Sequence, residues 1–237
     1  MARRHPVLSD DNLEVPVSAL GFQGFREWVQ SDSFPDTGRI DFLAGEIEVG
    51  MSPEDIRTHG LVKSALALGL GVFLDERGLG WLFIDRTRVA SPHAQLSAEP
   101  DLVVVFRDAL AAGRVSFRSW SKAHPERLTE IEGAVDLVVE VVSDSSVQKD
   151  TRTLPALYAR AGIPELWIAD ARGRNLRFRI HTLQDGVYAP VEASAGGWLR
   201  SPGLGADFRL VRQPDPFTGW RYRLERREPP LVSSMLP

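Results

Sequence analysis

Three acidic residues lie where strands are expected to begin or end, a pattern typical of a cation-binding site. Glu140 interrupts the β-branched apolar run 135–142, the kind of run that fills the middle of a sheet covered on both faces. Burying a bare carboxylate costs several kcal/mol or more, so Glu140 must have a charged partner, bind a cation or be protonated. Asp101 opens a second apolar run, 102–106, and Glu46 follows a glycine at a predicted turn.

Carboxylates on adjacent strands can share a hard divalent cation. Mg²⁺ typically takes one or two protein carboxylates together with waters and substrate oxygens. Such a metal activates water and stabilises charge on a phosphate, and a lysine or arginine within reach would support that charge. The residues leave a second interpretation open, in which Asp101 caps a turn, Glu140 forms a salt bridge and Glu46 is solvated.

The elements that would position these acids are readable from periodicity. Residues 135–170 predict a strand, a polar loop, a helix and a second strand, with the helix over 149–161. Its apolar positions are spaced by three and four, as on one helical stripe, and Gly162 and Pro164 end it. The sequence therefore predicts a β-α-β unit whose first strand carries Glu140 towards a polar loop.

Other patterns surround this unit. Alternating residues over 39–49 about a central Ala-Gly predict an N-terminal hairpin, and residues 53–76 predict a long helix. Residues 176–191 alternate about Asp-Gly and predict a C-terminal hairpin. Residues 118–127 are expected to form a basic loop. We expect an N-terminal arm over 1–20, one domain over 21–212 and a peripheral C-terminal tail over 213–237.

Composition narrows the class of protein without selecting a substrate. The 237 residues are 43% hydrophobic and 25% charged, ordinary values for a globular protein. No cysteine is present, which excludes disulfides, thiolate metal sites and cysteine nucleophiles. No run of about 18 apolar residues occurs, so no membrane span is expected and a cytoplasmic location is the default. The net charge of −4 provides no general basic field for nucleic acid.

Four motifs in the same order resemble those of the Uma-two family. The motifs cover Asp41 with 45–47 and 51–53, then 100–104, 137–143 and 157–167. This family is grouped with restriction endonucleases in the PD-(D/E)xK nuclease superfamily, and the resemblance extends over roughly residues 21–210.

The resemblance implies a restriction-endonuclease-like α/β core, with a mixed central β-sheet flanked by helices. It also implies an endonuclease that hydrolyses phosphodiester bonds with Mg²⁺ or Mn²⁺, in DNA or alternatively in RNA. Asp101 and Glu140 would be the metal ligands, and Glu46 a helper acid that adds a further carboxylate to the metal. A homodimer is expected, because members of the superfamily often cut two strands with two subunits.

One departure from the family pattern concerns the lysine. The superfamily places a lysine two residues after the second acid, where this chain has Val142, and relatives move it to the following helix, where this chain has Leu154. Lys149 and Arg152 are the remaining basic candidates. Lys149 would stabilise charge on a phosphate near Glu140, or would simply pair with Asp150 at the surface.

This departure keeps other functions in view. A catalytically inactive member of the fold would act as a nucleic-acid or protein interaction module, and a third interpretation is a hydrolase of a small phosphorylated molecule. His59, on the long helix, would either orient a metal-bound water or lie at the helix surface. Asp150 would pair with a base or, more simply, cap the helix.

Overall fold

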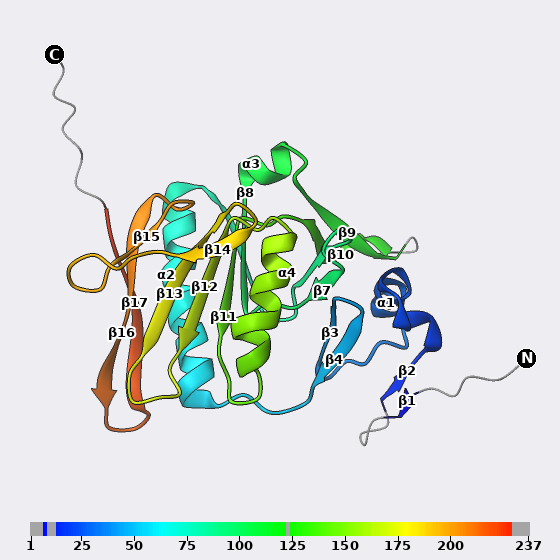
Figure 1. Ribbon diagram of the computed structural model, residues 1–237, viewed down its shortest axis with the longest axis horizontal. Helices are drawn as coiled ribbons and strands as arrows, with labels where there is room; N and C mark the ends of the chain where they lie inside the picture. The colour runs from blue at the N-terminus through cyan, green and yellow to red at the C-terminus, as the bar shows by residue number, and fades with distance from the viewer. Residues whose placement is uncertain (1–6, 9–12, 122–123, 229–237) are drawn as a thin grey trace, which may run out of the picture.

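The computed structural model describes residues 7–8, 13–121 and 124–228 and builds the chain around two six-stranded sheets (Figure 1). The central sheet has the order β14-β13-β12-β11-β8-β5. Its strands are β14 (Val187–Pro190), β13 (Arg177–Gln184), β12 (Glu165–Asp170), β11 (Leu137–Val141), β8 (Leu102–Phe106) and β5 (Gly80–Ile84). β11 and β12 pair in parallel and the other neighbours pair antiparallel, so the sheet is mixed.

The second sheet has the order β4-β3-β7-β6-β10-β9. Its strands are β4 (Glu46–Gly50), β3 (Arg39–Leu43), β7 (Leu96–Ala98), β6 (Arg88–Ser91), β10 (His124–Gly133) and β9 (Val115–Ser121). β3 and β4 form the predicted hairpin, with Leu43 opposite Glu46. Residues 118–127, expected to be a loop, lie instead in β9 and β10, although residues 122 and 123 are outside the described part.

Helices cover both faces of the central sheet. The long helix α2 (Leu61–Arg77) follows a π-helical turn (Ile56–Gly60) and packs on one face, whereas α4 (Leu154–Arg160) follows a second π-helical turn (Lys149–Thr153) and packs on the other. α1 (Phe22–Val29) and the 3-10 turn Val17–Leu20 lie beside β3, and the short α3 (Arg107–Ala111) follows β8. No helix in the described part of the chain is long and apolar enough to cross a bilayer.

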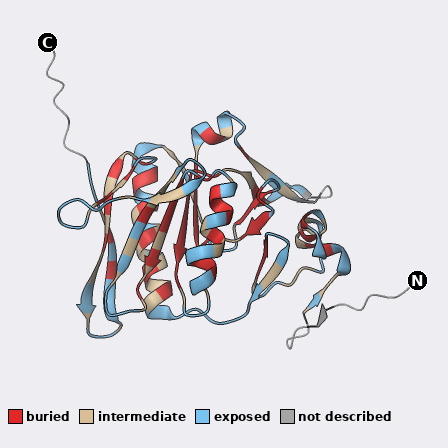
Figure 2. Ribbon diagram, in the orientation of Figure 1, coloured by how far each residue is buried: buried red, intermediate tan, exposed pale blue. Residues whose placement is uncertain are grey.

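Strand alternation decides which face carries Glu140. Leu137, Val139 and Val141 of β11 pack in the core formed with α2. Val138 packs in the core beneath α4. Because neighbouring residues of a strand point to opposite faces, Glu140 lies on the α4 face, which also faces the second sheet. Figure 2 shows that β11 is buried along its length.

The C-terminal region differs from the expected peripheral tail. β15 (Leu199–Ser201), β16 (Ala206–Asp215) and β17 (Gly219–Arg227) form a three-stranded sheet that packs against α2. The expected boundary at residue 212 therefore falls inside β16. Tyr222 and Leu224 are buried and alternate with the exposed Arg221 and Arg223. Because the segment is rich in arginine, the sequence did not predict a half-buried strand here. Residues 229–237 lie outside the described part.

The N-terminal region also packs more closely than an arm. The strands β1 (Val7–Leu8) and β2 (Glu14–Val15) pair antiparallel, and Ala19 is fully buried beside Phe25 of α1. The predicted fold class is confirmed: the domain is α/β, with a mixed central sheet flanked by helices. The predicted N-terminal hairpin, β3 and β4, belongs to the second sheet, and the predicted C-terminal hairpin, β13 and β14, forms one edge of the central sheet.

Candidate functional site

Asp101 and Glu140 lie side by side near the ends of two neighbouring central strands, β8 and β11. Asp101 directly precedes β8 and Glu140 lies in β11, and β8 and β11 are hydrogen-bonded neighbours, with Leu102 opposite Val139. The two side chains are 3% and 0% exposed. Asp101 Oδ2 accepts a hydrogen bond from the backbone nitrogen of Val141 at 2.7 Å, which fixes its orientation. Two buried carboxylates therefore share one small space.

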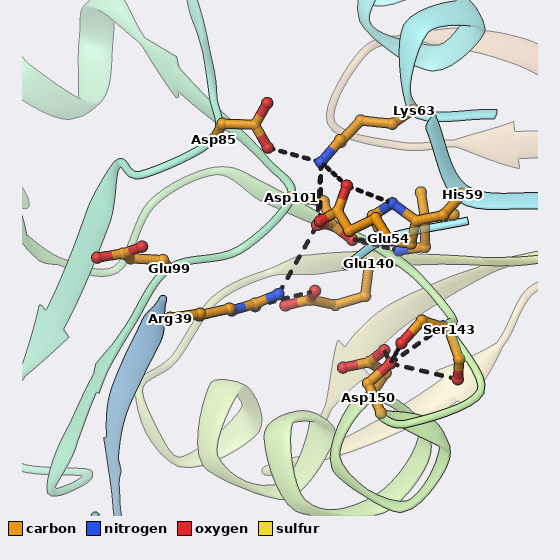
Figure 3. A network of polar contacts seen from close by, with 12 residues as sticks. Arg39, Glu54, His59, Lys63, Asp85, Glu99, Asp101, Glu140, Ser143 and Asp150 are labelled. Atoms are coloured by element: carbon orange, nitrogen blue, oxygen red, sulfur yellow. Dashed lines mark hydrogen bonds and ion pairs between the residues drawn. The ribbon is translucent and has the colours of Figure 1, made fainter. Parts of the chain in front are cut away.

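Arg39 reaches both carboxylates from the second sheet (Figure 3). Its Nη1 lies 3.7 Å from Asp101 Oδ1, and its Nη2 lies 3.6 Å from Glu140 Oε2. Its Nε lies 3.3 Å from Oδ2 of Asp41, the acid two residues further along β3. These separations are longer than those of close charge-assisted hydrogen bonds. A single guanidinium thus holds three acids loosely.

Burial and charge shift the ionisation of this group in opposite directions. Burial raises the pKa of Glu140 well above its usual range, with the charge of Asp101 adding to the effect and Arg39 opposing it. Burial also acts to raise the pKa of Asp101, but its contacts with His59 and Arg39 outweigh it and the pKa is lowered. Asp101 is therefore the carboxylate that stays ionised more readily, and Glu140 needs a stronger positive charge beside it to ionise.

His59 and Lys63 complete the group on the side of α2. His59 lies in the π-helical turn before α2, with Nε2 3.5 Å from Asp101 Oδ2 and Nδ1 2.9 Å from Oε2 of Glu54. Burial would lower the pKa of His59, but the contact with Asp101 outweighs it and raises the pKa. Lys63 Nζ contacts Glu54 at 2.9 Å and Asp85 at 2.7 Å.

Lys149 and Asp150 approach from the π-helical turn before α4. Lys149 Nζ lies 3.4 Å from Asp41 Oδ2 and 3.1 Å from Oε1 of Glu48, with 9% of the residue exposed. Asp150 accepts a hydrogen bond from Ser146, and burial raises its pKa to about 6. Each of the two π-helical turns thus contributes residues to this cluster of charged side chains. Such turns are frequent at functional sites.

Tyr158 of α4 supports Glu140 directly. Its hydroxyl donates a hydrogen bond of 2.5 Å to Glu140 Oε1, and both residues are fully buried. One turn earlier, Leu154 is fully buried in the core beneath α4. The helix therefore presents a hydroxyl to the carboxylate, and an apolar side chain at the position where the family resemblance led us to expect a lysine.

The donor set fits a hard divalent cation. Glu140 Oε2 and Asp150 Oδ1 are buried without a hydrogen-bond partner among the described residues, and a buried oxygen left without a donor is costly. Within the described residues, Glu54, His59 and Asp101 also offer ligand atoms that all lie within 4.8 Å of one another. A pocket of about 310 Å³ lined by Arg39, Glu54 and Asp101 gives access from solvent.

The structure brings together three of the four predicted site residues. Asp101, Glu140 and Lys149 lie in or beside the group that Arg39 and Asp41 connect. Glu46 does not join them, because it is exposed at the start of β4 and lines a different pocket. It lies two residues nearer the hairpin turn than Glu48, about 7 Å along the strand. Glu48 is the β4 acid that contacts Lys149.

The sequence-based prediction missed Arg39, Asp41 and Lys63 as parts of the site. The sequence signal for Arg39 and Asp41 was modest. They are two residues apart on β3, the first strand of the predicted hairpin, so their side chains share one face of the strand. Lys63 lies one helical turn after His59, on the same side of the helix. None of these spacings shows which other strand the residues will face.

The chain belongs to a family of nuclease-like proteins. The family model that matches residues 22–212 is Uma2, described as "Putative restriction endonuclease", so the resemblance found in the sequence is confirmed. A crystal structure described as a putative nuclease belonging to DUF820, from Anabaena variabilis, is similar in fold. Its TM-score is 0.57 at 13% sequence identity, over 78% of this chain and 90% of that one. No curated protein matches the chain.

Proposed function

We propose that this protein is a divalent-metal-dependent endonuclease that hydrolyses phosphodiester bonds in DNA, with Asp101 and Glu140 as metal ligands. The observation that carries the proposal is the pair of buried carboxylates on adjacent strands, of which Glu140 has one oxygen without a hydrogen-bond donor among the residues that the structure describes. The chain's place in a family of restriction-endonuclease-like proteins supports the nuclease part. Predictions of a homodimer and of a cytoplasmic location stay predictions.

Each neighbouring residue has a definite task in this proposal. Bound Mg²⁺ or Mn²⁺ would supply activation of water and stabilisation of charge on the phosphate. Val141 and Tyr158 orient the two carboxylates through their hydrogen bonds. Lys149, whose contacts are Asp41 and the half-exposed Glu48, is placed to stabilise negative charge on a phosphate oxygen. His59, whose pKa the contact with Asp101 raises, would hold a proton at the Nε2 that lies 3.5 Å from Asp101 Oδ2.

The test is cleavage of supercoiled plasmid with Mg²⁺ or Mn²⁺ present and with EDTA. We expect the wild type to nick the plasmid only with metal, and Asp101→Ala and Glu140→Ala to lose this activity. Asp75→Ala, which removes an exposed acid of α2, is the matched control and should retain it. Folded wild-type protein that nicks no nucleic acid with either metal would overturn the proposal.

A second candidate function is a catalytically inactive interaction module. The observation that favours it is Arg39, whose guanidinium already provides positive charge to both carboxylates, together with the apolar Leu154 at the lysine position. A thermal titration with Mn²⁺ separates the two functions, because a ligand that binds the folded state raises the unfolding temperature. A rise that Glu140→Gln abolishes supports the metal site, and an unchanged wild type supports the module.

A further inference from the structure

An aromatic groove adjoins the candidate site along β5. It has a volume of about 510 Å³, and its lining includes Trp81, Phe83, Phe117, Leu128 and Ile131. This volume lies within the range of small-molecule sites. Arg86 lines both this groove and the pocket above Asp101. The two spaces therefore meet at one arginine.

The strand register sets the distance between the groove and the carboxylates. Trp81 and Phe83 of β5 lie opposite Val105 and Val103 of β8, and Asp85 donates its backbone N–H to the carbonyl of Asp101. Because alternate residues share a face, the two aromatic side chains lie on the same side of the sheet as Asp101. Phe83 is about 7 Å and Trp81 about 14 Å along the strand from the row that contains Asp101.

The groove presents fixed aromatic rings to solvent. Trp81 is 40% exposed, and the guanidinium of Arg107 stacks at 4.7 Å from its ring centroid. Phe83 and Phe117 meet edge to face with centroids 5.9 Å apart. Rings held in place by such contacts lose little conformational entropy when a flat ligand stacks on them. Exposed aromatic side chains beside cationic ones are the usual elements of single-strand recognition.

The charge around the groove suits a phosphate backbone. Arg86 is exposed and carries no ion pair with any acid in the described part of the chain, and Arg107 flanks Trp81. Glu130 also lines the groove, but it is 3% exposed and paired with Arg26. The groove therefore combines an apolar aromatic lining with exposed arginines, which suits a base with its attached phosphate.

We propose that this groove binds an unpaired nucleobase of the polynucleotide substrate, stacked on Trp81 and Phe117, while Arg86 contacts the phosphate that leads to Asp101. The inference rests on the proposed nuclease function and narrows its substrate to single-stranded or locally unpaired DNA. Fully paired DNA keeps its bases stacked in the duplex and offers the groove no base without paying for unstacking.

The test is binding of a fluorescently labelled single-stranded DNA, measured by anisotropy against the blunt duplex of the same sequence. Measurements are made in EDTA, and again with Mg²⁺ on a Glu140→Gln background, where we expect no cleavage. Trp81→Leu removes the stacking ring and Trp81→Phe restores an aromatic one. Trp220→Leu is the matched control, because Trp220 is 36% exposed and also carries a stacked arginine, Arg212, at 4.3 Å.

We expect Trp81→Leu to raise the Kd for single-stranded DNA about five- to 150-fold. We expect Trp81→Phe, Trp220→Leu and all duplex affinities to change by less than about threefold, within the scatter of surface substitutions. Phe117→Leu should weaken single-strand binding in the same direction. If the matching RNA binds more tightly than DNA and Trp81→Leu weakens its binding to the same extent, the groove proposal is supported and the preferred single strand is RNA instead of DNA.

Unchanged single-strand binding by folded Trp81→Leu and Phe117→Leu would overturn the groove proposal. An equal loss of single-strand and duplex affinity would also overturn it, since Trp81 would then act through the fold. In either case metal-dependent plasmid nicking lost in Asp101→Ala would leave the proposed function standing. Absence of both nicking and polynucleotide binding would overturn the two proposals together.

Discussion

Two glutamates are buried on adjacent strands of the central sheet, Glu140 near the end of β11 and Glu165 at the start of β12. They are 0% and 3% exposed, and burial raises the pKa of both. Glu165 has a donor on each oxygen: Trp167 Nε1 at 2.6 Å from Oε1, and the backbone nitrogen of Gly203 at 3.1 Å from Oε2. Glu140 receives one hydrogen bond, from Tyr158, and its second oxygen has none among the described residues.

The difference in hydrogen bonding distinguishes a structural acid, Glu165, from an acid, Glu140, whose oxygen without a donor in the described part of the chain could bind a ligand. Glu165 ties β12 to the loop before β16, and its hydrogen bonds compensate for the water that it loses. Glu140 instead lies near Arg39, at 3.6 Å, and near the acids Asp101 and Asp150. A bound cation would therefore stabilise its ionised form. Burial alone therefore does not distinguish the two glutamates; the carboxylate oxygen of Glu140 that lacks a donor among the described residues does.

The largest expected effect comes from replacing each glutamate by glutamine. Glu140→Gln should lower metal-dependent nicking on the order of 10³-fold, because it removes a charge that acts on the metal. Glu165→Gln should leave nicking within about threefold once its folded fraction is taken into account. Plasmid nicking at matched concentrations of folded protein measures both. Equal losses in the two variants would break the distinction between the glutamates.

A second effect concerns pH and the neighbour of Glu140. Burial raises the folded-state pKa of Asp150 to about 6, above its value of about 3.9 in an unfolded chain. The raised pKa favours the folded state at low pH, and this contribution is lost as pH rises through about 6. Between pH 4 and 7 the wild type should lose roughly 2 kcal/mol of unfolding free energy relative to Asp150→Asn.

Urea unfolding in EDTA across this pH range measures the difference, with Asp170→Asn as the matched control. Asp170 is paired with Arg172, and these contacts lower its pKa despite partial burial. That variant should therefore show the opposite sign: the wild type gains stability relative to it as pH rises from the acid range. Parallel curves for wild type and Asp150→Asn would contradict the prediction.

A third effect tests the lysine that the site uses. Lys149→Ala should lower nicking on the order of 10²-fold, because it removes a positive charge beside the carboxylates. Arg152→Ala, which removes an exposed cation from the same π-helical turn, is the control and should retain activity. Retained activity in Lys149→Ala, or a matching loss in Arg152→Ala, would remove the assigned role of Lys149.

The smallest effect is on stability. Here we expect the Glu165 variant to lose more than the Glu140 variant, whereas for nicking activity we expect the Glu140 variant to lose more. Glu165→Gln should lower the unfolding free energy by about 1–3 kcal/mol. Trp167 and Gly203 donate to different carboxylate oxygens, and the substitution replaces one of these oxygens by an NH₂ group that cannot accept, which leaves one buried donor unsatisfied. Glu140→Gln should change it by less, because one oxygen already lacks a donor. Thermal unfolding in EDTA compares them, and a larger loss for Glu140→Gln would contradict this account of the two sites.

The local pattern determined much of this fold. The apolar run around Glu140, the alternation of 39–49 and the glycine at the end of the 149–161 helix each correspond to an element of the structure. These features are local, because strand and helix periods depend on nearby residues. The same pattern identified Asp101 and Glu140 as acids at strand edges, and it placed Lys149 at the start of a helix.

Only the tertiary structure decided which residues meet. Arg39 bridges Asp101 and Glu140 because β3 of the second sheet brings it next to these carboxylates, a contact between segments far apart in the chain. Glu48 rather than Glu46 reaches Lys149 because the hairpin register fixes the distance from the turn. Likewise, the charged sequence of β17 did not predict a half-buried strand, because the burial of Leu224 depends on packing against α2. Periodicity gives the face of each element, whereas the partner of that face depends on packing between elements.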